Sequence, residues 1–414
     1  MKRQAGLAFI LVTLLLDVLG FGLIIPIFPE LIKEVSGQNT SDAALLLGYM
    51  VAVFSLVQFV CSPILGGLSD QYGRRPILLI SLLGLALDYL LLAFAPTIGW
   101  IWVGRIIAGM TAANITAASA YIADVSAPED RAKNFGMMGA VFSVGFIIGP
   151  AIGGFLGEHG TRLPFFFAAG LAFLNWLYGF FVLPESHKKE NRKPFNIRNA
   201  NPVAALGLLR KYRVVFNLTG MFLLTNLANQ LLQNVWVLYT AERYGWGPQA
   251  NGFSLTAVGV MGAIVQGALV GILIPKLGEK RAILLGLGLG VVQFVAFGLA
   301  TEGWMVYAII IAGAIGGIAG PAIQGLVSRQ VSETEQGSVQ GALSGLWSLV
   351  SIVGPILATS IFAHFTRKGD GALYIPGMPF FVGALMMMLG TFIAVWAFRA
   401  KRYDDPMKLK PAED

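Results

Sequence analysis

Twelve apolar segments run along the chain, each long enough to cross a lipid bilayer as a helix. A spanning helix needs about 20 predominantly apolar residues, and backbone groups inside a bilayer must find their partners within the segment, which favours helices over strands. Only 12% of the residues are charged, about half the share typical of soluble proteins. We therefore expect an all-α membrane protein. The predicted spans are residues 5–27, 43–65, 77–95, 99–123, 134–157, 163–183, 214–240, 250–274, 281–300, 303–329, 336–362 and 375–398.

Basic residues are distributed unequally between the two sides of this predicted membrane protein. If successive loops alternate in side, 23 of the 29 lysines and arginines lie on the side of the termini, five lie on the other, and Arg105 lies within a span. Cytoplasmic loops carry such an excess, so we expect a multi-pass protein of the cell (inner) membrane with both termini in the cytoplasm. The net charge of +7 follows from this topology and is not evidence for nucleic-acid binding. We expect no nucleic-acid partner. The lipid bilayer is the expected environment, and we expect a monomer.

The two halves of the chain echo each other. "GGLSDQYGRRPIL" begins at Gly66 and "GILIPKLGEKRAI" begins 205 residues later, which is also the separation between the Gly-Pro pairs at 149 and 354. Two motifs at one offset indicate a duplication, which in transporters produces two bundles that rock around a midplane site. We expect a six-helix bundle over 1–183, a cytoplasmic linker over 184–213, a second six-helix bundle over 214–398 and a cytoplasmic tail over 399–414.

The loop between spans 2 and 3 combines glycines with opposite charges. Gly66 would permit close helix contact and Gly73 a tight turn, while Asp70 can pair with either Arg74 or Arg75 and meet a helix end. We interpret the loop as a latch that opens when the protein changes state. A generic basic turn is the plainer alternative. Pro275 replaces the aspartate in the second copy, so the latch is expected mainly in the first half.

Two further features are expected to take part in conformational switching. Gly149 and Pro150 lie within span 5, where proline kinks a helix and glycine lets a neighbour pack against the bend. An ordinary seam of small residues is the alternative. Asp124, at the cytoplasmic end of span 4, is expected near Arg131 as a latch residue.

Three ionisable residues lie deep within the predicted spans: Asp17, Asp88 and Arg105. A charge at the centre of a membrane helix costs at least roughly 2.5–3.5 kcal/mol, so these positions require a reason. Carboxylates that alternately meet an arginine and a drier pocket could bind and release a proton. We predict that the three residues couple transport to protons. A static ion pair or a hydrogen-bonded structural carboxyl remains the alternative.

Uncharged amides recur inside the spans, most densely along one face of span 7 in "TNLANQLLQNVW". Amides can orient a polar organic molecule without requiring that it be charged, although interhelical hydrogen bonding would also explain them. The aromatic ring at 236 could stack on a substrate or anchor the span at the interface. The predicted substrate-binding residues are Gln58, Asn114, Asn226, Asn229, Gln230, Gln233, Asn234 and Trp236.

Enzymatic chemistry finds no support in the sequence. The three histidines lie in loops or at span ends, so no metal-binding cluster is visible. No lysine-containing phosphate loop occurs, which argues against ATP as the energy source. We expect no cofactor, with a proton gradient supplying the energy and a divalent metal involved only if it accompanies the substrate.

Twelve spans in two halves with a basic central loop resemble the major facilitator superfamily, and "GGLSDQYGRRP" resembles its signature loop. From about residue 13 to 360 the chain is similar to the tetracycline/proton antiporters of the drug-exporting branch. Stretches such as "LLDVLGFGLIIP", "LALDYLLLAF", "GRIIAGMT" and "VWVLYTAERYGW" carry this resemblance. It implies the major facilitator fold, with transport roles for the aspartates at 17 and 88 and the arginine at 105.

The resemblance breaks at two positions in the second half. Tetracycline pumps of this group carry a membrane histidine and aspartate implicated in handling the proton and the metal–tetracycline cation, and Gly262 and Gly290 stand at those positions here. The leading hypothesis is proton-coupled efflux of a drug-like or amphipathic solute, with tetracycline the first candidate. A facilitator or proton symporter for a metabolite such as a sugar is the alternative, and a non-transporting ligand-binding protein is a third.

Overall fold

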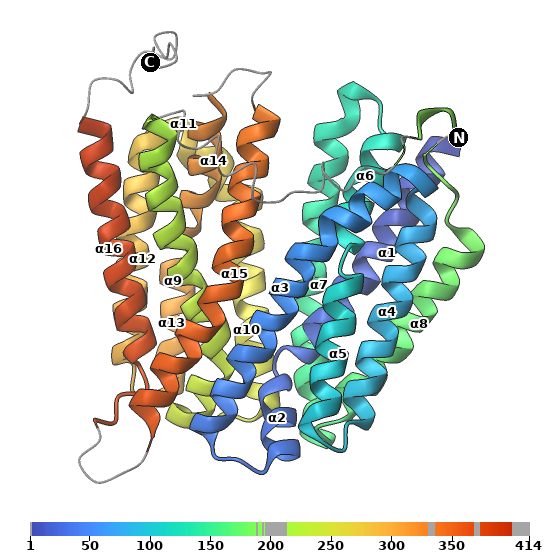
Figure 1. The fold of residues 1–414 in the computed structure, drawn as a ribbon. Coiled ribbons are helices and arrows are strands. Elements are labelled where there is room, and N and C mark those ends of the chain that lie inside the picture. Colours follow the sequence, from blue (N-terminus) through green and yellow to red (C-terminus); the bar gives the residue numbers. More distant parts are fainter. Residues whose placement is uncertain are drawn as a thin grey trace. The chain divides into compact units, whose positions relative to one another are not determined.

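The computed structural model describes residues 2–187, 189–192, 194, 213–329, 336–367 and 373–399. Every regular element in this part of the chain is a helix (Figure 1), as expected. Eleven of the described helical segments are long and apolar enough to cross a membrane. The remaining expected span coincides with α9 (Arg213–Tyr244), which the amides make more polar than most of the others.

Contacts group the chain into two units. The first unit comprises the described part of Met1–Asn201 together with Gly245–Val260, and the second comprises the described parts of Pro202–Tyr244 and Met261–Asp414. The predicted boundaries at 183 and 214 stay predictions. Most of the predicted linker, over 195–212, and all but the first residue of the predicted tail lie outside the described residues.

Rod-like helices form the first unit. Its elements are α1 (Lys2–Ile24), α2 (Phe28–Ser36), α3 (Thr40–Tyr72), α4 (Arg74–Phe94), α5 (Ile98–Thr111), α6 (Asn114–Val125), η1 (Pro128–Asp130), α7 (Arg131–His159), α8 (Leu163–Val182), η2 (Lys189–Asn191) and the first part of α10 (Pro248–Ile264). The short helix α2 was not expected, and span 4 is divided into α5 and α6 rather than forming one helix.

The second unit is also built from helices. Its elements are α9, the end of α10, η5 (Val265–Leu269), α11 (Val270–Leu277), α12 (Glu279–Leu299), α13 (Gly303–Gly313), η6 (Ala314–Ile318), α14 (Ala319–Arg329), α15 (Gln336–Thr366) and α16 (Met378–Arg399). Spans 8 and 10, expected as single helices, contain a π-helical turn at η5 and a 3-10 turn at η6.

Glycine allows two helices of the first unit to touch backbone to backbone. Gly22 of α1 faces Gly149 and Pro150 of α7, and a Cβ added at Gly22 would lie 3.0 Å from Gly149 Cα. One turn further along α7, a Cβ at Gly153 would collide with the carbonyl oxygen of Leu23. The close packing expected beside Pro150 is therefore confirmed, while the switching role of Gly149 and Pro150 stays a prediction.

Candidate functional site

Span 4 is interrupted in its middle. The α-helical pattern stops at Thr111 and restarts at Asn114, with the amide of Ala113 donating to the carbonyl of Thr111 at 2.8 Å. Gln58 of α3 donates through Nε2 to the carbonyl oxygen of Ala112 at 3.4 Å. Irregular backbone at membrane depth needs such partners. Gln58 therefore supports the break, in addition to its predicted role in substrate binding.

The break places an amide side chain against Asp17. Asn114 opens α6, and its Nδ2 donates to both carboxylate oxygens of Asp17, at 2.9 and 3.0 Å. The positive end of a helix dipole, at the start of α6, favours a nearby negative charge. Asp17 is partly exposed. Asn114, predicted as a substrate ligand, thus holds the candidate proton carrier.

Asp88 and Arg105 form a buried ion pair. Asp88 of α4 is fully buried and receives a hydrogen bond from the Arg105 guanidinium of α5. Arg105 is 8% exposed, and its guanidinium carbon lies 5.0 Å from the ring centre of Phe28 and 5.9 Å from that of Phe54. The sequence left open which aspartate this arginine meets, and the structure pairs it with Asp88.

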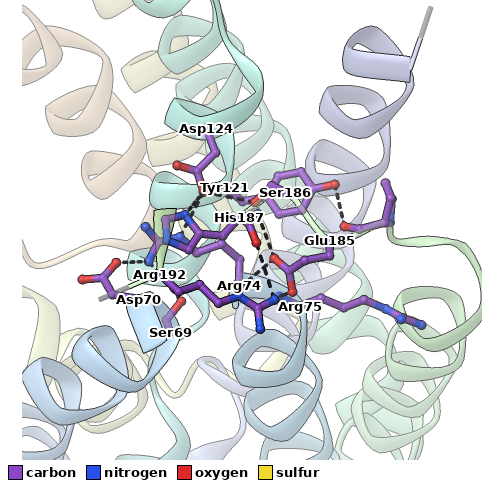
Figure 2. A network of polar contacts seen from close by, with 11 residues as sticks. Ser69, Asp70, Arg74, Arg75, Tyr121, Asp124, Glu185, Ser186, His187 and Arg192 are labelled. Carbon is purple, nitrogen blue, oxygen red and sulfur yellow. Dashed lines mark hydrogen bonds and ion pairs between the residues drawn. The ribbon is translucent and has the colours of Figure 1, made fainter. Parts of the chain in front are cut away.

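A second charged cluster surrounds the loop between α3 and α4 (Figure 2). Arg74 donates to Asp70 at 2.5 Å, to Ser69 Oγ at 3.2 Å and to Asp124 at 3.1 Å. Arg75 instead donates to the carbonyl oxygen of Phe180. Of the two expected latch partners of Asp70, Arg74 is therefore the one that pairs with it.

The segment that follows α8 lies against this latch, a contact that the sequence does not indicate. The carboxylate of Glu185 accepts from the backbone amides of Arg74 and Arg75 at 2.9 and 3.2 Å. These are otherwise unpaired groups at the start of α4. Gly73 has φ 107°, and a Cβ there would collide with Glu185. Gly73 is thus needed both for the turn and for the approach of this carboxylate.

Asp124 and its own helix α6 also contact the segment that follows α8 (Figure 2). Asp124 accepts from Ser186 Oγ at 3.2 Å and lies 3.5 Å from His187 Nδ1. Tyr121, one turn earlier on α6, donates to the carbonyl oxygen of Pro184 at 3.0 Å. The expected partner of Asp124, Arg131, is exposed at the start of α7, and Arg74 takes its place.

One expected packing contact is absent from the latch. Nothing in the described ranges lies within 4 Å of the point where a Cβ of Gly66 would be. The close helix contact predicted at Gly66 is therefore not formed here, and its switching role stays a prediction.

The amides of α9 are largely held by their own helix. Asn226 and Asn229 donate to the carbonyls four residues earlier, at 2.7 and 2.9 Å, and Asn234 donates to the carbonyl and side chain of Gln230. Gln233 is exposed. These residues stay predicted substrate ligands.

Two members of the predicted set face inward within the second unit. Gln230 Nε2 donates to Ser351 Oγ of α15 at 3.1 Å. Trp236 is 4% exposed, and its ring meets Phe297 edge-on at 5.1 Å. Trp236 is thus packed in the core, an arrangement that does not favour its predicted stacking on a substrate.

The two glycines that replace ionisable residues have different surroundings. A Cβ at Gly262 would have no atom of the described chain within 4 Å. A Cβ at Gly290 would lie 2.5 Å from Met387 Sδ. Side-chain volume can therefore be added at 262, whereas at 290 a methionine already fills the space.

Long apolar helices in two units, with a buried ion pair and a charged loop between α3 and α4, indicate a multi-pass membrane protein. The chain belongs to the major facilitator superfamily, whose family model matches residues 10–355 and 268–414. Its membership in this superfamily makes it a transporter and not an enzyme.

Relatives in sequence and structure agree with this placement. The chain is 40% identical to the Escherichia coli protein "Tetracycline resistance protein, class C" over 93% of its length and 96% of the relative's. It is 36% identical to the Escherichia coli protein "Tetracycline resistance protein, class B" over 92% of this chain and 94% of the relative. The structure also resembles the crystal structure of the human organic anion transporter MFSD10, with a TM-score of 0.70 and a sequence identity of 23%. The match covers 95% of this chain and all of the MFSD10 chain. The last comparison shows the shared fold.

Proposed function

We propose that this protein exports a drug-like or amphipathic organic solute, with tetracycline the first candidate, in exchange for protons that enter the cell. The observation that carries the proposal is the placement of two membrane carboxylates in the first unit with different partners. Asp17 is held by the neutral amide of Asn114, and Asp88 is paired with the charged guanidinium of Arg105.

The two partners suit different tasks. An amide N–H can donate to a carboxylate and equally to the carbonyl oxygen of a protonated carboxyl, so Asn114 can hold Asp17 in both states. Arg105 is always charged and therefore binds Asp88 best as a carboxylate. We accordingly assign proton binding to Asp17, with the Asp88–Arg105 pair as the element that responds. One charge crossing 100 mV supplies about 2.3 kcal/mol.

The substrate assignment is supported by the relatives. The similar proteins from Escherichia coli are named for tetracycline resistance. Without ionisable residues at 262 and 290, we propose that any divalent metal arrives bound to the substrate. The proposed location is the inner membrane, with both termini in the cytoplasm and the protein acting as a monomer.

The test uses purified protein in sealed vesicles with the proton concentration raised outside the compartment that holds tetracycline. Antiport predicts that tetracycline leaves that compartment as protons enter it. Asp17→Asn and Asp88→Asn should each lose this gradient-driven export while retaining exchange of labelled for unlabelled tetracycline. Glu129→Gln, an exposed residue between α6 and α7, is the matched control and should transport normally.

Three results would overturn the proposal. With tetracycline placed outside instead, its entry together with the protons would indicate symport, and binding without movement would indicate a non-transporting receptor. Export that survived both aspartate substitutions would show that the energy coupling lies elsewhere.

A further inference from the structure

Tyr89 follows Asp88 on α4 and carries a buried hydroxyl that no described residue satisfies. Its side chain is 1% exposed, and its oxygen has no hydrogen-bond partner among the described residues. Buried hydroxyls are normally paired, so each exception calls for an explanation. The mechanism outlined above does not use this group.

The tyrosine ring reaches the face of α1 that carries Asp17. Its Cε2 and hydroxyl oxygen lie 3.3 and 3.7 Å from the point where a Cβ of Gly20 would be. Gly20 is three residues beyond Asp17, and residues at this spacing are neighbours on one helix face. The absence of a side chain at Gly20 therefore lets the hydroxyl approach the surroundings of Asp17.

Charged groups from three helices act on this hydroxyl. Asp17 of α1, Asp88 of α4 and Arg105 of α5 all interact with it electrostatically. Gly104 lies beside Asp88 in turn, because a Cβ there would be 2.7 Å from Asp88 Oδ1. Tyr89 thus lies within electrostatic range of both acidic residues, which otherwise have separate partners.

The same cluster contains three more buried atoms without a partner in the described chain. They are Asp88 Oδ1, Arg105 Nε and Asn114 Oδ1. Together with the Tyr89 hydroxyl, these atoms are two donors and two acceptors, so the side chains around Asp17 and Asp88 have unused hydrogen-bonding capacity. That capacity is what a second pairing arrangement of these side chains would use.

We propose that Tyr89 is a positioning residue whose hydroxyl links proton binding at Asp17 to the Asp88–Arg105 pair. Hydrogen bonds to an ionised acceptor are roughly twice as strong as neutral ones. While Asp17 is ionised, its charge competes for the hydroxyl. When Asp17 binds a proton, the hydroxyl turns to Asp88 Oδ1, the oxygen left unpaired by the guanidinium, and draws part of the negative charge away from Oδ2, where Arg105 binds. No covalent bond changes in this step, and the proton stays on Asp17.

The inference rests on the proposed proton antiport, and Tyr89→Phe tests it without removing the ring that packs against Gly20. In vesicles, tetracycline exchange by this variant should stay within about twofold of the unaltered protein, while gradient-driven export falls at least roughly tenfold. That loss is the size expected when one hydrogen bond to a charged group is removed. The number of protons entering per tetracycline exported should also fall. Tyr178→Phe, which removes a hydroxyl from α8 of the same unit, should change neither quantity.

The outcomes distinguish a failure of this inference from a failure of the proposed antiport. If the Tyr89→Phe variant shows normal proton-driven export while Asp17→Asn does not, Tyr89 plays no part in coupling and the proposed antiport stands. If Tyr89→Phe loses exchange and binding together with export, its role is packing and the inference is wrong. If Asp17→Asn itself couples normally, the proposed function fails and the link through Tyr89 fails with it.

Discussion

Removing one member of the buried Asp88–Arg105 pair should destabilise the first unit more than most single changes. In Asp88→Asn the guanidinium, 8% exposed, keeps its charge and loses its carboxylate. Breaking a buried pair in this way costs about 3–5 kcal/mol. The rings of Phe28 and Phe54 remain beside the guanidinium, and cation–π contact keeps the loss near the lower limit. We expect a loss of about 3 kcal/mol.

The double variant Asp88→Asn/Arg105→Gln removes both charges and should recover most of this loss, because two neutral amides can bond to each other. The measurement is the apparent melting temperature in detergent at one heating rate, since unfolding of such proteins is rarely reversible. At about 2–4 °C per kcal/mol for a unit of this size, the single variant should melt roughly 6–12 °C lower.

Asp130→Asn, an exposed carboxylate before α7, is the matched control and should melt like the unaltered protein. The reasoning is refuted if Asp88→Asn melts within about 2 °C of it, a shift worth under 1 kcal/mol. A double variant no more stable than the single one would refute it equally, because the loss would then not come from an uncompensated charge.

Two further predictions concern packing and pH. Gly153→Ala should lower stability by about 1–3 kcal/mol in the same melting assay, because the added methyl group would meet the carbonyl of Leu23. Gly139→Ala, on the same helix, adds its methyl group to open space and should be neutral or stabilising. Equal effects of the two substitutions would contradict the α1–α7 contact. Burial and the hydrogen bond to Glu242 raise the pKa of Tyr374 to about 12 from 10.0, so its neutral form adds stability below about pH 10 that is lost as pH rises through 12. Spectrophotometric titration of Glu242→Gln, with Tyr374→Phe subtracted as the blank, should return the pKa toward its ordinary value, and an unchanged value would exclude Glu242 as a cause.

The sequence predicts the structure well where length and hydropathy decide it. The long helices between α1 and α16 follow from the need to satisfy backbone groups inside a bilayer, and the apolar segments of the sequence show where these helices lie. The sequence does not predict features that depend on a partner far along the chain. The interruption after Thr111 carries no proline, and Gln58, which supports it, lies on another helix.

The candidate site shows the same division. The chemistry of Asp17, Asp88 and Arg105 was visible as charge inside apolar segments. Their partners were not, because pairing depends on the rotation and depth of each helix. The contact of Glu185 with the start of α4 spans 111 residues, and nothing near either residue in the sequence indicates it.

The unequal surroundings of Gly262 and Gly290 decide what an ionisable side chain would displace if it were added to the second unit at either position. At 262 a larger side chain enters open space. At 290 the flexible end of Met387 occupies the position, so an aspartate there requires that side chain to shift. A side chain added at 262 therefore leaves its neighbours in place, whereas one added at 290 changes the packing between α12 and α16.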